Sequence, residues 1–264
     1  MKPTLADDIN TLAAFCTLRD IPALTQANLQ KAYNFPQADA FVLFGGTILA
    51  GIEPLVTAMK NQVAKKYLIV GGQGHTTDAL RDKIRQAYPM IATDQSEAEM
   101  FNDILYLKLG QTADYLEVQS TNCGNNITNL LKLLTKNKLP KKSLILSQDA
   151  TMQRRMSATL EKFAPQTTII NYASYTIQTK IENRKLQFDQ SLLGMCEMEQ
   201  YITLLLGEIS RLQNTPSGYG PLGKDFMAPV FIPEDVLAAF HRVAQAFPNK
   251  IRTANSAYAK ELAE

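Results

Sequence analysis

The sequence predicts an α/β fold with a Rossmann-like, doubly wound and mainly parallel sheet of about five strands. Two observations predict it. Short apolar runs alternate with helical patterns between residues 39 and 172, and these runs are continuous, of the kind expected when helices cover both faces of a sheet. The helical stretches are also long enough to serve as right-handed crossovers between parallel strands.

The expected strands are rich in β-branched and aromatic residues and are bounded by turn residues; they span 40–44, 67–70, 115–118, 143–147 and 167–172. Helical patterns lie between them, near 51–64, 76–87, 96–109, 124–137 and 152–163. The first 35 residues, 195–213 and 233–246 are also expected to be helical, and 214–226, rich in Gly and Pro, is an expected loop. We therefore predict a core over 36–190 and a helical flank formed by 1–35 and 191–264.

Charge and composition indicate a globular protein without a broad electrostatic field. The chain has 27 Lys and Arg against 25 Asp and Glu, a net charge of +2, and 45% hydrophobic residues. This balance excludes an extended disordered chain and does not make nucleic acid the default partner. The expected partner is a small molecule, and composition leaves the oligomeric state open.

The cysteines and the lengths of the apolar runs indicate the cellular compartment of the protein. Cys16, Cys123 and Cys196 are odd in number and widely spaced, which fits neither a disulfide framework nor a zinc site. The first residues hold acidic side chains where a signal peptide has an apolar run, and no stretch reaches about 18 consecutive apolar residues. A cytoplasmic protein without membrane insertion is therefore expected.

Functional groups concentrate after the expected strands, while the opposite connections hold ordinary turn residues. In a parallel sheet the carboxyl ends of neighbouring strands form one edge, where ligands bind. Four consecutive strands are followed by such groups: GGT at 45–47, GGQGH at 71–75, QSTNCGNN at 119–126 and QDATMQRR at 148–155. We therefore expect the ligand-binding site at this edge.

Each segment offers a specific contact beside a purely structural role. Glycines at 45–46 and 71–74 allow a ligand close to the backbone, or simply form a tight turn. Ser120, Thr121 and Asn122 open a helix and suit an anionic or polar head group, or cap that helix. Asp149 can accept from a hydroxyl or ammonium group, and Arg154 or Arg155 can hold a carboxylate or phosphate.

Other candidates have weaker patterns. Cys123, at a helix amino terminus, is a conceivable nucleophile, although no partner base is identifiable and a half-buried structural thiol is the favoured interpretation. His75 and His241 are the only histidines, so a multi-histidine metal site is excluded; His75 is a plausible ligand contact and His241 a structural residue. Glu97 either reaches the edge or complements its helix dipole.

In these segments the chain resembles the YdcF-like branch of the SanA/ElyC/YdcF family, over roughly residues 38–234. The shared stretches are GGQGH (71–75), EA (97–98), QSTNCGNN (119–126), QDATMQRR (148–155) and LLGEISRLQNTPSGYGPLGKDF (205–226). The resemblance implies a Rossmann-like core and a nucleotide-utilising protein that can hold S-adenosylmethionine.

The chain departs from the broader family at three positions. Cys123 and Asn125 stand where relatives tend to have Thr and Glu, and Met152 stands where they usually have His, whereas Arg155 matches a retained Arg. The missing Glu and His are the pair best suited to general acid–base work, so hydrolase activity is not expected.

From the residues and the resemblance together we predict a protein that binds S-adenosylmethionine at the strand ends and requires no metal. Whether the protein is an enzyme stays open. It could be a transferase with an unknown acceptor, or a non-catalytic ligand sensor. A third alternative is a phosphoryl or glycosyl-phosphate enzyme that acts on an envelope precursor, with Asp149 and Glu97 holding a metal. The predicted ligand-binding residues are Gly45, Gly46, Gly71, Gly72, Gly74, His75, Glu97, Ser120, Thr121, Asn122, Asn126, Asp149, Thr151, Arg154, Arg155 and Tyr219.

Overall fold

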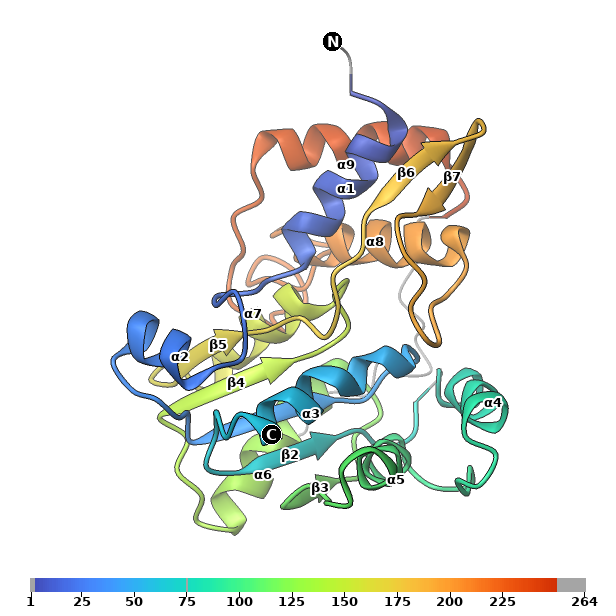
Figure 1. The fold of residues 1–264 in the computed structure, drawn as a ribbon. Coiled ribbons are helices and arrows are strands. Elements are labelled where there is room, and N and C mark those ends of the chain that lie inside the picture. The colour runs from blue at the N-terminus through green and yellow to red at the C-terminus, as the bar shows by residue number, and fades with distance from the viewer. Residues whose placement is uncertain (1–2, 75, 251–264) are drawn as a thin grey trace.

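The computed structural model describes residues 3–74 and 76–250 and contains a five-stranded, all-parallel sheet in the order β3-β2-β1-β4-β5 (Figure 1). The doubly wound α/β fold expected from the sequence is confirmed. The strands are β1 (Ala40–Phe44), β2 (Tyr67–Val70), β3 (Tyr115–Glu117), β4 (Ser143–Ser147) and β5 (Thr168–Asn171). They agree with the expected strands to within one residue at each end.

The strand order creates one reversal. The chain proceeds outward from β1 through β2 to β3, then crosses back to place β4 on the other side of β1 and continues to β5. At such a reversal the connections leave β1 and β4 in opposite directions, which opens a crevice beyond their carboxyl ends.

Helices cover both faces of the sheet because alternate strand residues face opposite sides. On one face, Phe41, Leu43 and Ile69 belong to an apolar cluster shared with helices on that side. On the other, Val42 and Leu146 pack with a second set. The first set is α2 (Gln26–Tyr33), α3 (Glu53–Lys60), α4 (Thr77–Ala87) and α5 (Glu97–Leu109), and the second is α6 (Cys123–Lys136) and α7 (Gln153–Phe163).

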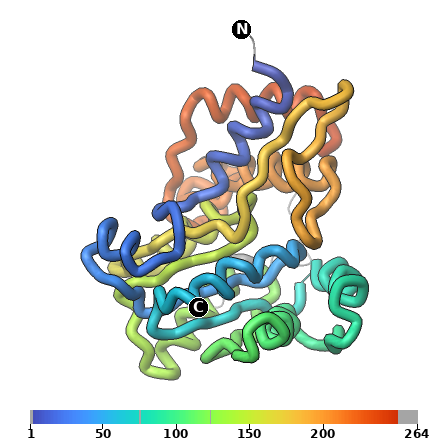
Figure 2. Tube along the Cα trace, viewed as in Figure 1, coloured from blue at the N-terminus to red at the C-terminus, as the bar shows by residue number. Residues whose placement is uncertain are grey.

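The first and last helices of the described chain meet in a separate helical layer, which Figure 2 shows beside the sheet in blue and red. It consists of α1 (Leu5–Cys16), α8 (Met198–Leu212), α9 (Glu234–Ala246) and a hairpin of β6 (Thr179–Glu182) and β7 (Lys185–Phe188). Their apolar side chains form one cluster that also includes Ala150 and Ala158 beside the sheet. Arg242 of α9 donates to Asp8 of α1 at 2.6 and 2.8 Å.

Two elements differ from the expectation. The hairpin was not predicted, because its two-residue turn is Asn183-Arg184, both with positive φ, instead of the Asn-Gly that marks such turns in a sequence. A short 3₁₀-helix, η1 (Leu49–Ile52), precedes α3, so the α-helix expected from about residue 51 begins at Glu53. The expected helices at both ends are present, up to residue 250.

The packing of residues outside the sheet bears on the predicted division. Leu24 and Leu29 belong to the apolar cluster of the sheet, although they precede residue 36. Leu186 and Phe188 of the hairpin pack on the flank, although they precede residue 191. The division into a core over 36–190 and a two-part flank stays a prediction about folding units. Within the described residues, no helix combines the length and apolarity that crossing a membrane requires.

Candidate functional site

A small pocket lies at the reversal between β1 and β4, at the edge where the sequence places the ligand. Its cavity volume is about 10 Å³. The segments that follow β1, β4 and β5 form most of the lining of this pocket, and α5 also contributes to it. The lining residues are Leu43, Phe44, Gly46, Ile48, Gly51, Phe101, Gln148, Asp149 and Ser174.

Asp149 is the charged group of this pocket. Its Oδ1 accepts three hydrogen bonds, from the backbone N–H of Thr151 at 2.9 Å, the Thr151 hydroxyl at 2.7 Å and the Tyr175 hydroxyl at 3.0 Å. The turn that positions it is held by Gln148, whose Oε1 accepts from the Asp149 backbone N–H. All three bonds to the carboxyl converge on one oxygen, so Oδ2 takes part in none of them.

Burial decides the protonation behaviour of Asp149. The side chain is 8% exposed, and loss of hydration raises its pKa above the ordinary value, while the bonds from Thr151 and Tyr175 act in the opposite direction. The nearby carboxylate of Glu208 also raises it. A cationic or hydroxyl-bearing ligand at this carboxyl would replace the hydration that folding removes.

Glu97 is a second buried carboxyl at the same edge, beside the end of β1. It opens α5, whose start is fixed by a capping box in which Ser96 and Glu99 exchange hydrogen bonds. Its Oε1 accepts from the Thr77 hydroxyl at 2.8 Å. Its Oε2 lies so close to Gly45 that a Cβ built on this glycine would be 2.6 Å away, so only glycine fits opposite this carboxyl.

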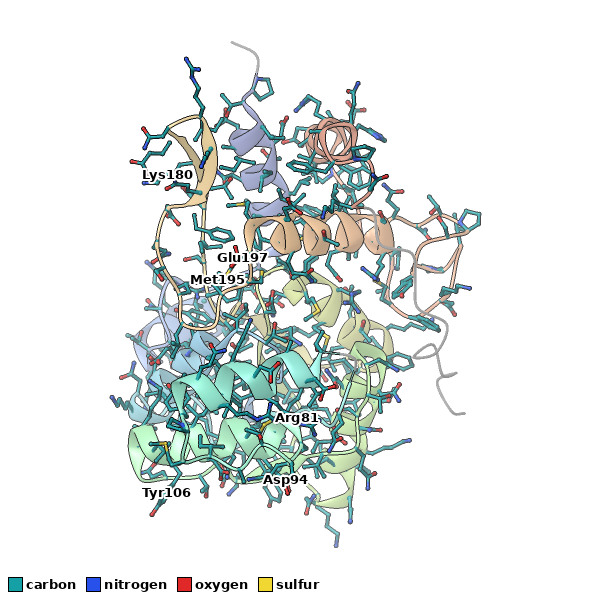
Figure 3. The ribbon with its side chains drawn as sticks, turned by 90° about the vertical axis from the view of Figure 1, so that its right-hand side faces the viewer. Arg81, Asp94, Tyr106, Lys180, Met195 and Glu197 are labelled. Atoms are coloured by element: carbon teal, nitrogen blue, oxygen red, sulfur yellow. The ribbon has the colours of Figure 1, made fainter. Side chains whose placement is uncertain are left out.

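The electrostatics of Glu97 parallel those of Asp149. Burial raises the pKa of Glu97, and the Thr77 hydroxyl and the guanidinium of Arg81 partly offset this effect. Figure 3 shows Arg81 between α4 and α5, where its guanidinium also donates to the backbone carbonyl of Gln95. The edge therefore contains two carboxyls whose ionised form is disfavoured by burial.

The loops after β2 and β3 pack against each other through glycines. A Cβ on Gly72 would lie 2.2 Å from the backbone oxygen of Ser120, and one on Gly74 would lie 3.1 Å from that of Thr121. The Gly72 N–H donates to the Ser120 hydroxyl at 3.0 Å. Glu117, at the end of β3, accepts from the backbone of Gln119 and Ser120. Gly71, next to it, packs against the end of β1.

The start of α6 follows directly. Asn122 caps the helix by accepting from the backbone N–H of Asn125 at 3.0 Å, and Asn126 donates its N–H to the Asn122 carbonyl. Among the described residues, the buried Oδ1 of Asn125 has no hydrogen-bond partner. His75 and the side chain of Cys123 lie outside what the structure describes.

Arg154 and Arg155, in the first turn of α7, are directed toward the flank. Arg154 donates to the Phe15 carbonyl, and its guanidinium lies 4.0 Å from the centroid of the Phe15 ring. Arg155 makes a two-pronged ion pair with Glu208 of α8, at 2.5 and 2.8 Å, and lies 6.0 Å from the ring of Tyr219. Both arginines thus fasten α7 to the flank, and a ligand contact would compete with these partners.

The structure brings most of the predicted residues to one edge, in the order of the strands. Ser120 lies beyond β3, Gly71 and Gly72 beyond β2, Gly45 and Glu97 beyond β1, and Asp149 with Thr151 beyond β4. Thr121 is exposed on the outer side, and Arg154, Arg155 and Tyr219 lie on the flank side of α7. That any of them binds a ligand stays a prediction.

Sequence reasoning missed several residues of the site. Ser174 and Tyr175 follow β5 and obey the strand-end rule, so extending that rule to the fifth strand would have found them. Thr77 donates to Glu97, which lies 20 residues further along the chain, so a local pattern gives no sign of this contact. Glu117 and Gln148 instead accept from backbone N–H groups of their own turns.

No model of a known protein family matches the chain. Among the described residues, no three His, Cys, Asp or Glu side chains form a group that could hold a metal ion.

Proposed function

We propose that this protein binds a nucleotide-type ligand, S-adenosylmethionine first, at the carboxyl edge of the sheet between β1 and β4. One observation carries the proposal: the buried carboxyl of Asp149 lines a pocket with Gly46 at the reversal of strand order. A Cβ on Gly46 would meet its nearest neighbour, Gln148 Oε1, at 3.7 Å, so the glycine leaves room for one more group of about methyl size. Crevices of this kind receive nucleotides in open parallel sheets.

The charge of the edge favours a ligand with cationic and hydroxyl groups over one rich in phosphate. Asp149 and Glu97 are buried carboxyls that lack a salt-bridged cation among the described ion pairs. The two arginines expected to hold an anion already contact Phe15 and Glu208. S-adenosylmethionine offers a sulfonium, an ammonium and ribose hydroxyls, each of which a carboxylate can stabilise.

The resemblance to the YdcF-like branch supports the same ligand. Of the stretches shared with it, GGQGH, QSTNCGNN and QDATMQRR all come directly after strands at this edge. When bound, S-adenosylmethionine supplies an activated methyl group. A transferase of this kind needs its protein mainly to orient the ligand and exclude water, which suits a site without an evident base.

The proposal is tested by thermal unfolding of the purified protein with S-adenosylmethionine, S-adenosylhomocysteine, ATP, NAD, nucleotide sugars and inorganic phosphate, each with and without magnesium. A ligand at 100 times its dissociation constant adds about 2.7 kcal/mol. For a protein of this size that corresponds to a rise in Tm of about 5–10 °C. We expect this rise with S-adenosylmethionine and its loss in Asp149→Asn.

Other outcomes favour the other functions. A rise that requires both magnesium and a phosphate compound would overturn the proposal in favour of phosphoryl transfer, with Asp149 and Glu97 as metal ligands. Binding of S-adenosylmethionine without methyl transfer to any acceptor tested would favour a ligand sensor. For both alternatives, the variants to test are substitutions of the residues that line the pocket between β1 and β4.

A further inference from the structure

Residues 189–197, here called the strap, connect the hairpin to α8 and cross the edge that holds the pocket. Figure 3 looks onto this edge and shows Met195 of the strap above α4, next to Glu197 at the start of α8. The Leu193 carbonyl accepts from the Ala50 N–H at 2.9 Å. Gly194 has a φ of 76°, and a Cβ on it would lie 2.7 Å from the Leu49 nitrogen. The strap thus rests on the connection that follows β1.

Lys83 of α4 fastens the strap from the opposite side. Its ammonium donates to the Gly194 carbonyl at 2.5 Å and to the Thr47 carbonyl at 3.0 Å. Thr47 lies between Gly46 and Ile48, which both line the pocket. One half-buried cation therefore joins α4, the strap and the rim of the pocket.

Lys83 donates to two neutral backbone carbonyls, although the Asp149 carboxyl is near enough to affect its pKa. Burial lowers the pKa of Lys83, and the negative potential of Asp149 partly restores it. A carboxylate or phosphate oxygen is a stronger acceptor for an ammonium than a backbone carbonyl. An anionic group that reached the rim would thus compete with Gly194 for this ammonium.

The pocket is too small for a nucleotide-type ligand while the strap is fastened. Its volume of about 10 Å³ compares with roughly 300–1,000 Å³ for sites that hold such ligands. No strap residue lines the pocket, but the strap borders its rim at Thr47 and Leu49. It is held there by a few hydrogen bonds and by the packing at Gly194, so moving it would uncover this rim.

We propose that Lys83 binds the anionic group of the ligand and releases the strap in doing so. This inference rests on the proposed function and names its substrate class: a ligand with a zwitterionic amino-acid head group, whose ammonium faces Asp149 and whose carboxylate takes the place of the Gly194 carbonyl. A phosphate could use the same cation, and the test separates the two sources.

The first arm tests the strap without any ligand, through Cys196. This thiol lies in the strap and is half buried; burial raises its pKa to about 11, while Lys83 lowers it. Removing Lys83 without moving the strap would therefore make the thiol less acidic and slow its alkylation. Opening of the strap would make alkylation faster. The sign of the change thus separates a fastening role from a purely electrostatic one.

We expect Lys83→Met to raise the rate at which N-ethylmaleimide labels Cys196, followed by peptide mass spectrometry, at least several-fold. Lys83→Gln is expected to raise the labelling rate of Cys196 as well. If Lys83→Met does not fold, the result for Lys83→Gln decides whether Lys83 fastens the strap. Arg85→Met, at an exposed cation on the same helix, is the matched control and should leave the rate unchanged. An equal or slower rate in both Lys83 variants would overturn the inference.

The second arm compares S-adenosylmethionine with 5′-methylthioadenosine, which keeps the adenosyl group and lacks the head group, and with inorganic phosphate. We expect Lys83→Met to weaken S-adenosylmethionine about tenfold or more, as for a lost charged hydrogen bond, and to leave 5′-methylthioadenosine unchanged or tighter. Equal weakening of both would contradict the anion-binding role. A loss confined to phosphate would assign Lys83 to a phosphate ligand and overturn the zwitterion.

The two arms keep the failures apart. Absence of S-adenosylmethionine binding in the wild-type protein would contradict the proposed function. The labelling rate of Cys196 would still decide whether Lys83 fastens the strap.

Discussion

Asp149 is a buried carboxyl that the fold surrounds with neutral hydrogen-bond donors. Its carboxyl accepts from Thr151 and Tyr175, and neither of them supplies a compensating charge. An amide side chain could occupy the same place without the cost of removing a carboxylate from water, whereas an apolar one would leave the Thr151 N–H and the Tyr175 hydroxyl without this acceptor. Carboxyls that line pockets and have a shifted pKa are frequent at functional sites, and for this reason we propose Asp149 as the central residue of the site.

The pH dependence of stability tests this cost. Because burial raises the pKa of Asp149 in the folded protein, the wild type loses stability as the pH rises from the ordinary carboxyl range near 4 through the raised value. Asp149→Asn lacks this titration. Its free energy of unfolding relative to wild type should therefore increase between pH 4 and pH 8, by about 1.4 kcal/mol for each pH unit between the two pKa values.

Urea unfolding of both proteins at pH 4, 6 and 8 measures this difference. Asp94→Asn, at an exposed position, is the control and should change the free energy of unfolding by less than about 0.5 kcal/mol at each pH. A difference for Asp149→Asn that stays flat or falls as the pH rises would show that the carboxyl is not penalised by burial.

At the scale of elements, α7 is the link between the sheet and the flank. Its first turn follows Asp149, and the ion pair of Arg155 with Glu208 ties it to α8 in a nearly solvent-free setting, with side chains 11% and 4% exposed. Arg211 is 3.4 Å from the same Glu208. The geometry of the β4 strand end thus depends on how α8 docks.

Breaking this pair on one side should be costly. Arg155→Met leaves the buried Glu208 carboxylate with the longer contact to Arg211, so we expect a loss of about 3 kcal/mol in the free energy of unfolding, at the lower end for breaking a buried pair. The double variant Arg155→Met with Glu208→Leu should lose less, because the buried carboxylate is then gone and Arg211 is the one charge of the cluster that stays. Chemical denaturation checks both, and Arg85→Met, which breaks an exposed pair with Asp82, should cost about 0–1 kcal/mol. A double variant less stable than the single one would contradict this account.

How far the sequence predicted these elements depends on their range. The five strands and the helices between them were predicted to within a few residues, because apolar periodicity and turn residues are local. The order of the strands was not, since a crossover leaves no local trace. The hairpin at 179–188 was missed because Asn183-Arg184 lacks the glycine of a typical turn signal.

The residues of the candidate site were likewise predictable where their signal in the sequence is local, and not elsewhere. Gly45, Gly72 and Asp149 were found because each directly follows a strand. Lys83 was not, because it lies in mid-helix and acts on a strap more than 100 residues away in sequence. The role of Arg155 beside Glu208 needed the docking of α8, which only the folded chain provides.

On the scale of the whole molecule, the flank and the sheet share packing. The apolar cluster of the flank includes Ala150 and Ala158, which belong to the β4–α7 connection and to α7. The strap and the ion pair at Glu208 add two further links across the same boundary. The site lies where these links converge, so its geometry depends on both parts.

This sharing predicts one cooperative unfolding transition. Differential scanning calorimetry should give a calorimetric enthalpy equal to the van't Hoff enthalpy, and amides of α9 and of β1 should exchange with similar protection. Two separated transitions, or early exchange of the flank as a unit, would instead make the flank an independent domain.

The central claim is that the strand ends of β1 and β4 bind S-adenosylmethionine, and calorimetric titration of this ligand tests it most directly. The wild-type protein should bind one equivalent. Asp149→Asn, which removes the charge, and Gly46→Ala, which fills the pocket while its Cβ meets only an ordinary contact at 3.7 Å, should each weaken binding about tenfold or more. Equal affinity in all three proteins, or no binding to the wild type, would contradict the account.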